Sequence, residues 1–361
     1  MGPTFLIFLS SGLFLGWSLG ANDGANVFGT AVGSRMLRFL TAAWVGGVFV
    51  VLGAVISGAG ASHGLGELGK VNALGGSFTV ALGAALTVYG MTKLGLPVST
   101  TQAIVGGIVG WNLFSGTPTD LAALTRIVGT WVAAPLLGAL FALVLYRATE
   151  RAIHRIKPHL LWLDQWTRIG LLAAGAFAAY SLGANNIANV VGVFVPTSPF
   201  ADISVGGIVT LSGHQRLFLM GGLAIAVGTF FSRRVMITVG RSIVPVGPVG
   251  GWVVVVAQAL VLLIFSSQSL QAFVVRLGLP AIPLVPVSST QAVVGAVCGL
   301  ALARGLRGAR QIKWTVLRNI ALGWVATPAL AAVITYVALY FVQNVFEQPV
   351  YQAVGAVAAG Q

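Results

Sequence analysis

Charge is scarce in this sequence. Only 7% of its 361 residues are Asp, Glu, Lys or Arg, and only 7 are acidic, whereas a soluble globular domain carries about a quarter charged residues. Cysteine is almost absent as well, since Cys298 is the single one, and this excludes an intrachain disulfide. Hydrophobic residues instead make up 57% of the chain. This composition excludes a soluble domain and predicts an all-α polytopic membrane protein.

Uninterrupted apolar runs support this fold class, because a helix of about 20 residues crosses a hydrocarbon core roughly 30 Å thick. The clearest runs are residues 40–60, 72–92, 121–146, 249–271 and 314–342. No Lys or Arg precedes Arg35, so the first apolar run lacks the basic start of a signal peptide. We expect that run to be retained as part of the fold.

The basic residues lie in short connections between the apolar runs. The formal net charge of +13 is therefore better explained by the excess of Lys and Arg in cytoplasmic loops than by a nucleic-acid partner. By this rule all but four of the 20 basic residues are cytoplasmic, the exceptions being Lys70, Arg126, Arg216 and Arg276. We expect a multi-pass protein of the cell membrane, a bacterial inner membrane being favoured, with both termini outside the cytoplasm.

Two polar segments each occur twice, in the same order. Residues 18–29 return as residues 181–192, and the Pro-Val-Ser segment at 97–102 returns at 286–291. This order indicates a duplication. Five crossings per half would invert the second copy in the membrane. Basic residues follow the first copy of the amide segment but not the second, and the second copy of the Pro-Val-Ser segment but not the first, as inversion requires.

The sequence thus predicts two inverted-topology repeats of about five crossings each, with broken helices that meet near the middle of the membrane. The predicted division is a first transmembrane repeat at 1–146, a basic cytoplasmic connection at 147–168, a second, inverted repeat at 169–342 and a C-terminal tail at 343–361.

The first repeated segment predicts a cation site. Its polar residues are Asn22, Asp23 and Asn26, and in the second copy Asn185, Asn186 and Asn189. An ionisable group such as Asp23 inside an apolar span marks a functional site by default. Flanking glycines predict that the helices open here, for example over 20–24, and add backbone carbonyl oxygens. These oxygen ligands suit a proton on Asp23 or Na⁺, whose predicted ligands are Asp23, Asn22, Asn26, Asn185 and Asn189. The alternative is that the asparagines only bond neighbouring helices together.

The second repeated segment predicts an anion site. Its residues are Ser99, Thr100, Thr101 and Gln102, and in the second copy Ser288, Ser289, Thr290 and Gln291. Each copy has the pattern of a capping box, in which Ser caps the helix and Gln bonds back to the cap. A helix that begins inside the membrane also points free N–H groups and its positive dipole end into the site. Two such helix starts could hold one tetrahedral oxyanion; the alternative is a purely structural cap.

Four glycines follow the two Pro-Val-Ser segments at a spacing that lets helices approach closely. They are Gly106 and Gly110 in the first half and Gly295 and Gly299 in the second. We assign them to helix packing.

The motif pairs resemble the inorganic phosphate transporter (PiT) family of secondary carriers. The matching stretches are residues 20–26, residues 183–189 and the two Pro-Val-Ser segments, which follow in order over nearly the whole transmembrane region. The resemblance implies an inverted-repeat carrier that moves phosphate with Na⁺ or H⁺, with the amide motifs at the cation sites and the hydroxyl residues facing the anion. A homodimer is implied by the resemblance alone.

Two departures from the family pattern bear on the substrate. Asn186 stands where phosphate carriers of the family usually have an aspartate, and Gln102 and Gln291 stand where histidine is common. The loss of one negative charge leaves the number of coupled cations open. It also leaves open the sulfate-permease branch of the family. Phosphate near neutral pH carries a proton that it can donate to an acceptor, whereas sulfate carries none, so a site with fewer charged acceptors favours phosphate less strongly over sulfate.

We therefore expect a cation-coupled symporter of a small inorganic tetrahedral oxyanion, phosphate ahead of sulfate, that works by alternating access. An anion channel built from the same donors is the second alternative. An enzyme is not expected, because one aspartate without a second acid, a metal cluster or a nucleophile–base pair does not make a catalytic site. The expected partners are the anion, the lipid bilayer and the coupling ion, Na⁺ or H⁺, with no other cofactor.

Overall fold

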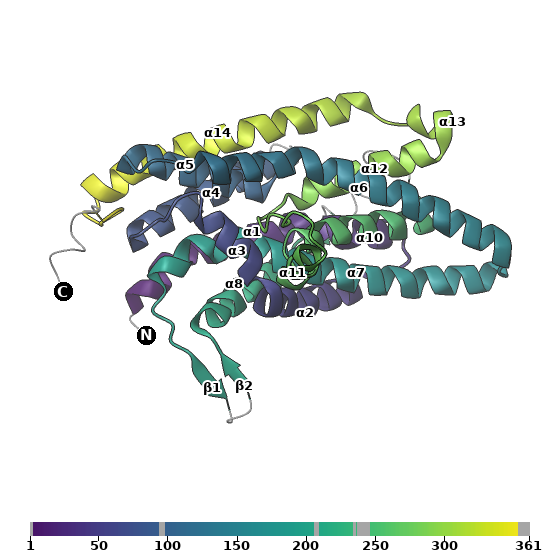
Figure 1. Ribbon diagram of the computed structural model, residues 1–361, viewed down its shortest axis with the longest axis horizontal. Coiled ribbons are helices and arrows are strands. Elements are labelled where there is room, and N and C mark those ends of the chain that lie inside the picture. The colour runs from purple at the N-terminus through teal and green to yellow at the C-terminus, as the bar shows by residue number, and fades with distance from the viewer. Residues whose placement is uncertain (1–2, 94–97, 206–208, 234–235, 237–245, 353–361) are drawn as a thin grey trace.

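The computed structural model describes residues 3–93, 98–205, 209–233, 236 and 246–352. Almost all of this chain is helical (Figure 1). The long helices of the first half are α1 (Pro3–Gly33), α2 (Phe39–Ser57), α4 (Leu74–Lys93), α5 (Thr100–Ser115) and α6 (Leu121–Ile156). Those of the second half are α7 (Leu160–Val191), α8 (Gly213–Thr229), α10 (Pro248–Ile264), α12 (Ser289–Ala303) and α14 (Trp314–Asn344). Shorter pieces are α3 (Ala59–Gly66), the 3-10 helix η1 (Gly192–Thr197), α11 (Gln268–Arg276) and α13 (Gly305–Ala309).

Six of the described helices are long and apolar enough to cross a membrane, and the bent pair of α10 and α11 would make a seventh span. The six are α1, α2, α4, α6, α7 and α14. Helices α5, α8 and α12 have 16, 17 and 15 residues, which is short for a full crossing of the bilayer. The prediction of a helical, polytopic membrane protein is confirmed.

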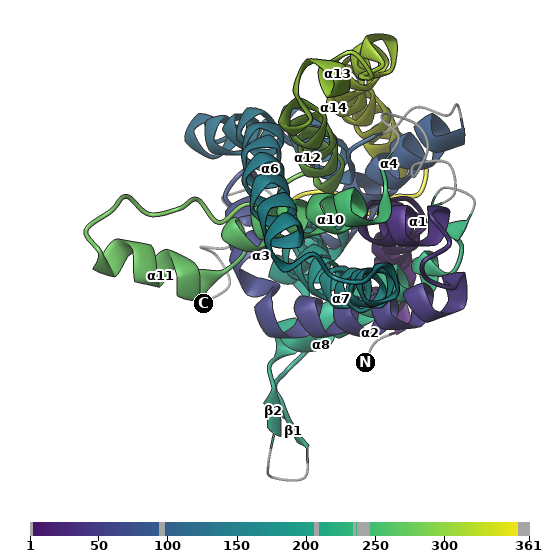
Figure 2. The same cartoon turned by 90° about the vertical axis from the view of Figure 1, so that its right-hand side faces the viewer.

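The break between α10 and α11 corrects the predicted span at 249–271. Helix α10 stops at Ile264, and α11 departs from it at 72°. The reason is local, because the Ser267 side chain accepts the N–H of Leu270 at 3.2 Å and so caps a new helix. Helix α11 projects to one side of the helical bundle (Figure 2).

A second element that the sequence did not predict is a small antiparallel hairpin of β1 (Ile203–Val205) and β2 (Val209–Leu211), with Ile203 opposite Leu211. It projects from the bundle below α8 in Figure 2. The basic segment 147–168 is itself mostly helical: α6 continues to Ile156, α7 begins at Leu160, and Lys157 ends α6 in a left-handed conformation with φ of 48°.

The helices that follow the Pro-Val-Ser segments pack across the two halves. Helix α5 lies on α14, and α12 lies on α6. A methyl group at Gly106 of α5 would overlap the backbone of Pro328, and one at Gly295 of α12 would overlap the backbone of Pro135. The same overlaps recur one turn later at Gly110 and Gly299. The packing role predicted for these glycines is confirmed.

The helices that carry the amide motifs also pack on helices of the other half: α1 lies on α8, and α7 lies on α2. Helices α1 and α7 themselves run in opposite directions. Gly12, near the start of α1, lies against Phe194 just beyond the end of α7, whereas Phe28, near the end of α1, lies against Gly175. Matching helices of the two halves are thus antiparallel at this pair.

The two ends of the molecule differ in charge. The basic α6–α7 turn and α13 lie at the right of Figure 1, and the start of α1 and the end of α14 lie at the left. The C-terminal segment is held at that left end because the Trp111 indole donates to the carbonyl of Val350 at 2.8 Å and the Asn72 amide donates to that of Gln352 at 2.9 Å.

We expect the substitution Gly295→Ala to lower the free energy of unfolding by roughly 1–3 kcal/mol, the usual cost of overpacking, because the added methyl group would overlap the backbone of Pro135. Thermal unfolding of the purified protein in detergent measures the loss. Gly129→Ala on α6 is the control, since nothing lies within 4 Å of a methyl group there. Equal unfolding temperatures for the two variants would contradict this account of the α12–α6 contact.

Candidate functional site

Helices α5 and α12 begin inside the protein at the two Pro-Val-Ser segments. Ser99 caps α5 by accepting the N–H of Gln102 at 3.3 Å, and Ser288 caps α12 by accepting the N–H of Gln291 at 3.2 Å. The serine caps were predicted correctly. The glutamine half of the capping box is wrong, because Oε1 of both glutamines is buried without a hydrogen-bond partner in the protein. The motif proline Pro97 lies outside the described residues.

The two helix starts are tied to one another. The Thr101 hydroxyl of α5 donates to the carbonyl of Val287, and the Thr290 hydroxyl of α12 donates to the carbonyl of Val98, both at 3.3 Å. Each bond is the counterpart of the other in the repeat. The free N–H groups and positive dipole ends of two helices therefore meet at one place in the buried interior.

The first amide motif contacts the start of α12 directly. Asp23 of α1 is only 3% exposed. One of its oxygens accepts the Ser289 hydroxyl at 2.7 Å and the other accepts the Asn22 amide at 3.0 Å. One turn further along α1, the Asn26 amide donates to the hydroxyls of Ser289 and Thr290, both at 3.3 Å. The predicted cation residues and anion residues thus form one network.

The second amide motif contacts the start of α5. The Asn189 amide of α7 donates to the Thr101 hydroxyl and to Oδ1 of Asn186, both at 2.9 Å. Both asparagines are fully buried. Nδ2 of Asn186 and Oδ1 of Asn189 have no partner in the protein, so each retains one group that a ligand could use.

Asn185 is placed differently from the other predicted cation residues. Its Oδ1 accepts the N–H of Val287 at 2.7 Å, and its Nδ2 donates to the carbonyls of Leu262 and Val285, both at 3.4 Å. Both ends of its amide are used to hold the segment before α12 against the end of α10. Asn185 therefore helps to position the start of α12, and its amide oxygen is already occupied by a donor.

The predicted opening of the helices at the amide motifs is wrong. Helix α1 is continuous through 20–24, and α7 is continuous through 181–191. Glycine permits an unusual backbone conformation without imposing one. An intact helix also forms its backbone hydrogen bonds internally, which the hydrocarbon core of a bilayer favours. The motifs consequently offer side-chain oxygens, whereas the expected backbone carbonyls stay within the helices.

Several buried polar atoms around the helix starts have no partner in the protein. They are Oγ1 of Thr100, Oε1 of Gln102 and Gln291, Nδ2 of Asn186 and Oδ1 of Asn189. A buried polar group without a partner typically costs about 1–3 kcal/mol. Their concentration beside one carboxylate and two helix N-termini fits a site for a small polar ligand.

Sequence reasoning missed Gln258. This side chain of α10 is fully buried, and neither of its amide atoms has a partner in the protein. The available signal was a single amide within the apolar run 249–271.

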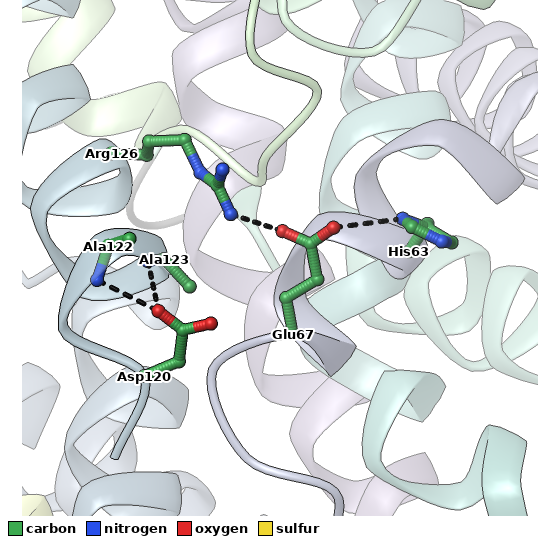
Figure 3. Close-up of polar contacts among 6 residues, drawn as sticks. All are labelled: His63, Glu67, Asp120, Ala122, Ala123 and Arg126. Carbon is green, nitrogen blue, oxygen red and sulfur yellow. Dashed lines mark hydrogen bonds and ion pairs between the residues drawn. The ribbon is translucent and has the colours of Figure 1, made fainter.

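A second polar cluster joins the residues at the end of α3 to α6. Glu67, the residue that follows α3, forms an ion pair with Arg126 of α6, and His63 lies 3.5 Å from the other Glu67 oxygen (Figure 3). Asp120 caps α6 beside it by accepting the N–H groups of Ala122 and Ala123. A pocket of about 480 Å³ next to the ion pair is lined by residues that include His63, Glu67, Arg126, Gln268, Gln271 and Leu284. The sequence placed Glu67 in a loop and Arg126 within the apolar run 121–146, and could not pair them.

The chain resembles known transport proteins over nearly its full length. It is 27% identical to a protein of Pyrococcus horikoshii named "Putative phosphate permease", with 92% of this chain and 96% of that protein covered. It is 24% identical to "Inorganic phosphate transporter 2-1, chloroplastic" of Arabidopsis thaliana, with 90% of this chain and 70% of that protein covered. A solved structure named "The sodium-dependent phosphate transporter" has a similar fold, with a TM-score of 0.72 and 24% identity, and the match covers 95% of this chain and 99% of that one.

A family model described as "Phosphate transporter family" matches residues 19–335 and 281–356. The match includes both amide motifs and both helix starts, and it confirms the family resemblance read from those motifs. This multi-pass membrane protein belongs to the phosphate transporter family.

Proposed function

We propose that the protein is a symporter that carries inorganic phosphate together with a cation, by alternating access. The observation that carries the proposal is the 2.7 Å hydrogen bond from the Ser289 hydroxyl to the Asp23 carboxylate. This bond joins the residue best suited to a cation with the helix start best suited to an anion. Two ligands that share one network can affect one another's binding, which is the requirement for coupling.

The starts of α5 and α12 supply the anion site. Helix N-termini bind phosphate through free N–H groups and the positive end of the helix dipole. Hydroxyl groups add donors without adding charge. The proposed anion ligands are Ser99, Thr100, Thr101, Gln102, Ser288, Ser289, Thr290 and Gln291, of which Ser99 and Ser288 also cap the helices.

Asp23 is the proposed cation ligand, with Asn22 and Asn26 beside it. A serine hydroxyl has a single proton to donate, and in this structure the Ser289 proton is directed at Asp23. A cation bound to the carboxylate would compete for the same oxygen and free the Ser289 hydroxyl to donate to phosphate. The solved transporter with the similar fold is named as sodium-dependent, which favours Na⁺ over H⁺ as the coupling ion here.

The alternating-access proposal rests on an inverted repeat. Two observations support it: α1 and α7 are antiparallel, and corresponding helices of each half pack on helices of the other half. The basic end of the molecule is assigned to the cytoplasm by the positive-inside rule, which puts both termini outside, and a bacterial inner membrane is the proposed location. A homodimer stays a prediction from the family resemblance.

Two alternatives fit the site less well. A sulfate permease would use the same donors, but the family and the relatives named above point to phosphate. An anion channel needs no cation network, whereas the buried Asp23 carboxylate lies within hydrogen-bond distance of the anion-site helix.

Uptake into proteoliposomes tests the proposal. We expect labelled phosphate to accumulate against its gradient when a Na⁺ gradient is imposed, because the cation would bind at Asp23 and drive anion entry. A pH gradient imposed separately distinguishes Na⁺ from H⁺. Uptake that only equilibrates phosphate would favour a channel, and sulfate uptake that excess phosphate does not inhibit would overturn the substrate assignment.

We expect Asp23→Asn to reduce cation-driven uptake to background while the protein remains folded, because the amide cannot supply the negative charge that holds a buried cation. Cation dependence of uptake and thermal unfolding are measured in parallel. Asp164→Asn is the control, since Asp164 is exposed near the α6–α7 turn and pairs with Arg168. Normal cation dependence in Asp23→Asn would refute the role of Asp23.

We expect the double variant Ser99→Ala and Ser288→Ala to weaken phosphate binding about tenfold or more. Each lost cap should also lower the free energy of unfolding by roughly 1 kcal/mol. Ser212→Ala is the matched control, because Ser212 caps α8 through the same bond to the third residue, Gln215, outside this site. Phosphate affinity comes from calorimetry and stability from thermal unfolding. If the double variant only loses stability, as the control does, the serines are structural caps and nothing more.

A further inference from the structure

The two halves of the site can be compared residue by residue. Asn26 and Asn189 occupy the same place in the repeated amide motif, and Thr290 and Thr101 occupy the same place in the repeated helix start. The bond from the Asn26 amide to the Thr290 hydroxyl, 3.3 Å, has its counterpart in the bond from the Asn189 amide to the Thr101 hydroxyl, 2.9 Å. This amide–hydroxyl bond is therefore repeated in the two half-sites.

Other bonds of the two half-sites differ. The bonds from Asn22 to Asp23 and from Asn26 to Ser289 are not repeated at the corresponding residues of the second half-site, and the contact of Asp23 with Ser289 is the difference that bears most on the ligand. Asp23 accepts the Ser289 hydroxyl at 2.7 Å in the first half-site. The corresponding residues in the second half-site are Asn186 and Thr100, and neither Nδ2 of Asn186 nor Oγ1 of Thr100 has a hydrogen-bond partner in the protein. Asn186 is 1% exposed and Thr100 is 3% exposed. A donor amide and a hydroxyl group are thus left unpaired where the first half-site has a carboxylate and its donor.

The orientation of Asn186 decides which ligand it suits. Its Oδ1, the atom that would bind a cation, already accepts the Asn189 amide at 2.9 Å. The unpaired atom is Nδ2, which carries two N–H donors and would repel a cation. The second half-site therefore offers hydrogen-bond donors where the first offers a negative charge.

The charge available in the site is equally one-sided. Asp23 is the single acidic side chain among the buried residues that the structure describes. A buried cation without a compensating charge is strongly disfavoured. One carboxylate therefore balances one monovalent cation, and the second half-site has no charge with which to hold another.

We propose that Asn186 and Thr100 donate hydrogen bonds to the transported anion, so that the second half-site belongs to the phosphate and one monovalent cation, held at Asp23, accompanies each anion. This assignment rests on the proposed function and departs from the sequence-based placement of Asn186 among the cation ligands. It divides the duplicated motif into one cation-binding copy and one anion-binding copy.

Equilibrium binding to the purified protein tests the assignment without transport. We expect Asn186→Ala and Thr100→Val each to weaken the binding of inorganic phosphate about tenfold, the loss typical of one hydrogen bond to a charged group. The binding of Na⁺ in the absence of phosphate should stay unchanged in both variants. Thermal unfolding verifies that they are folded, and Asn344→Ala, at the exposed end of α14, is the control that should alter neither affinity.

The variant Asn186→Asp tests the cation count. It restores to the second half-site the carboxylate that the first half-site has, so the Na⁺ dependence of phosphate binding should steepen from a Hill coefficient of about 1 to about 2. The same measurement made against pH covers a proton in place of Na⁺. A wild-type Hill coefficient near two, or an Asn186→Ala variant that loses Na⁺ affinity in the absence of phosphate, would overturn the assignment. Because these are binding measurements, they are independent of whether uptake into liposomes is coupled.

Discussion

The hydrogen bond between the Ser289 hydroxyl and the Asp23 carboxylate is the interaction on which the site depends. A carboxylate in apolar surroundings must be compensated, and here the compensation comes from a helix that starts in the other half of the chain. Residues separated by more than 260 positions are thereby brought into one network. The charge that could hold a cation is consequently in direct contact with the helix end that could hold an anion.

That network depends on helices that approach one another at backbone distance. At the α5–α14 and α12–α6 contacts, glycine lies against the backbone at and after a proline, and a methyl group would not fit. Close packing of this kind replaces the hydrophobic driving force, which acts only weakly between helices in lipid. It also holds the short helices α5 and α12 against α14 and α6, so the glycines that allow this contact, one to three turns from the hydroxyl groups, help to position them.

Composition and the length of the apolar runs predicted the membrane class and most spans, because long apolar runs have few structural alternatives in a bilayer. The serine caps at Ser99 and Ser288 were equally readable, since capping depends on a few neighbouring residues. The opening of α1 and α7 was wrong, because glycine allows a break but tertiary contacts decide whether it occurs. The bend after α10 and the strand pair β1–β2 were missed because a few polar residues between apolar runs can mark a helix end, such as the cap at Ser267, without specifying the direction of the next element.

The sequence by itself determined that two polar motifs are each repeated, that one copy of the amide motif carries a carboxylate and the other an amide, and that the chain lies in a membrane. The tertiary structure alone decided the partners: Asp23 with Ser289, Asn189 with Thr101, and Asn185 with the backbone before α12. It also decided which atom of Asn186 is left for a ligand. The physical reason is that composition and local pattern fix the cost of burying a polar group, whereas the partner that meets this cost is supplied by a distant part of the chain.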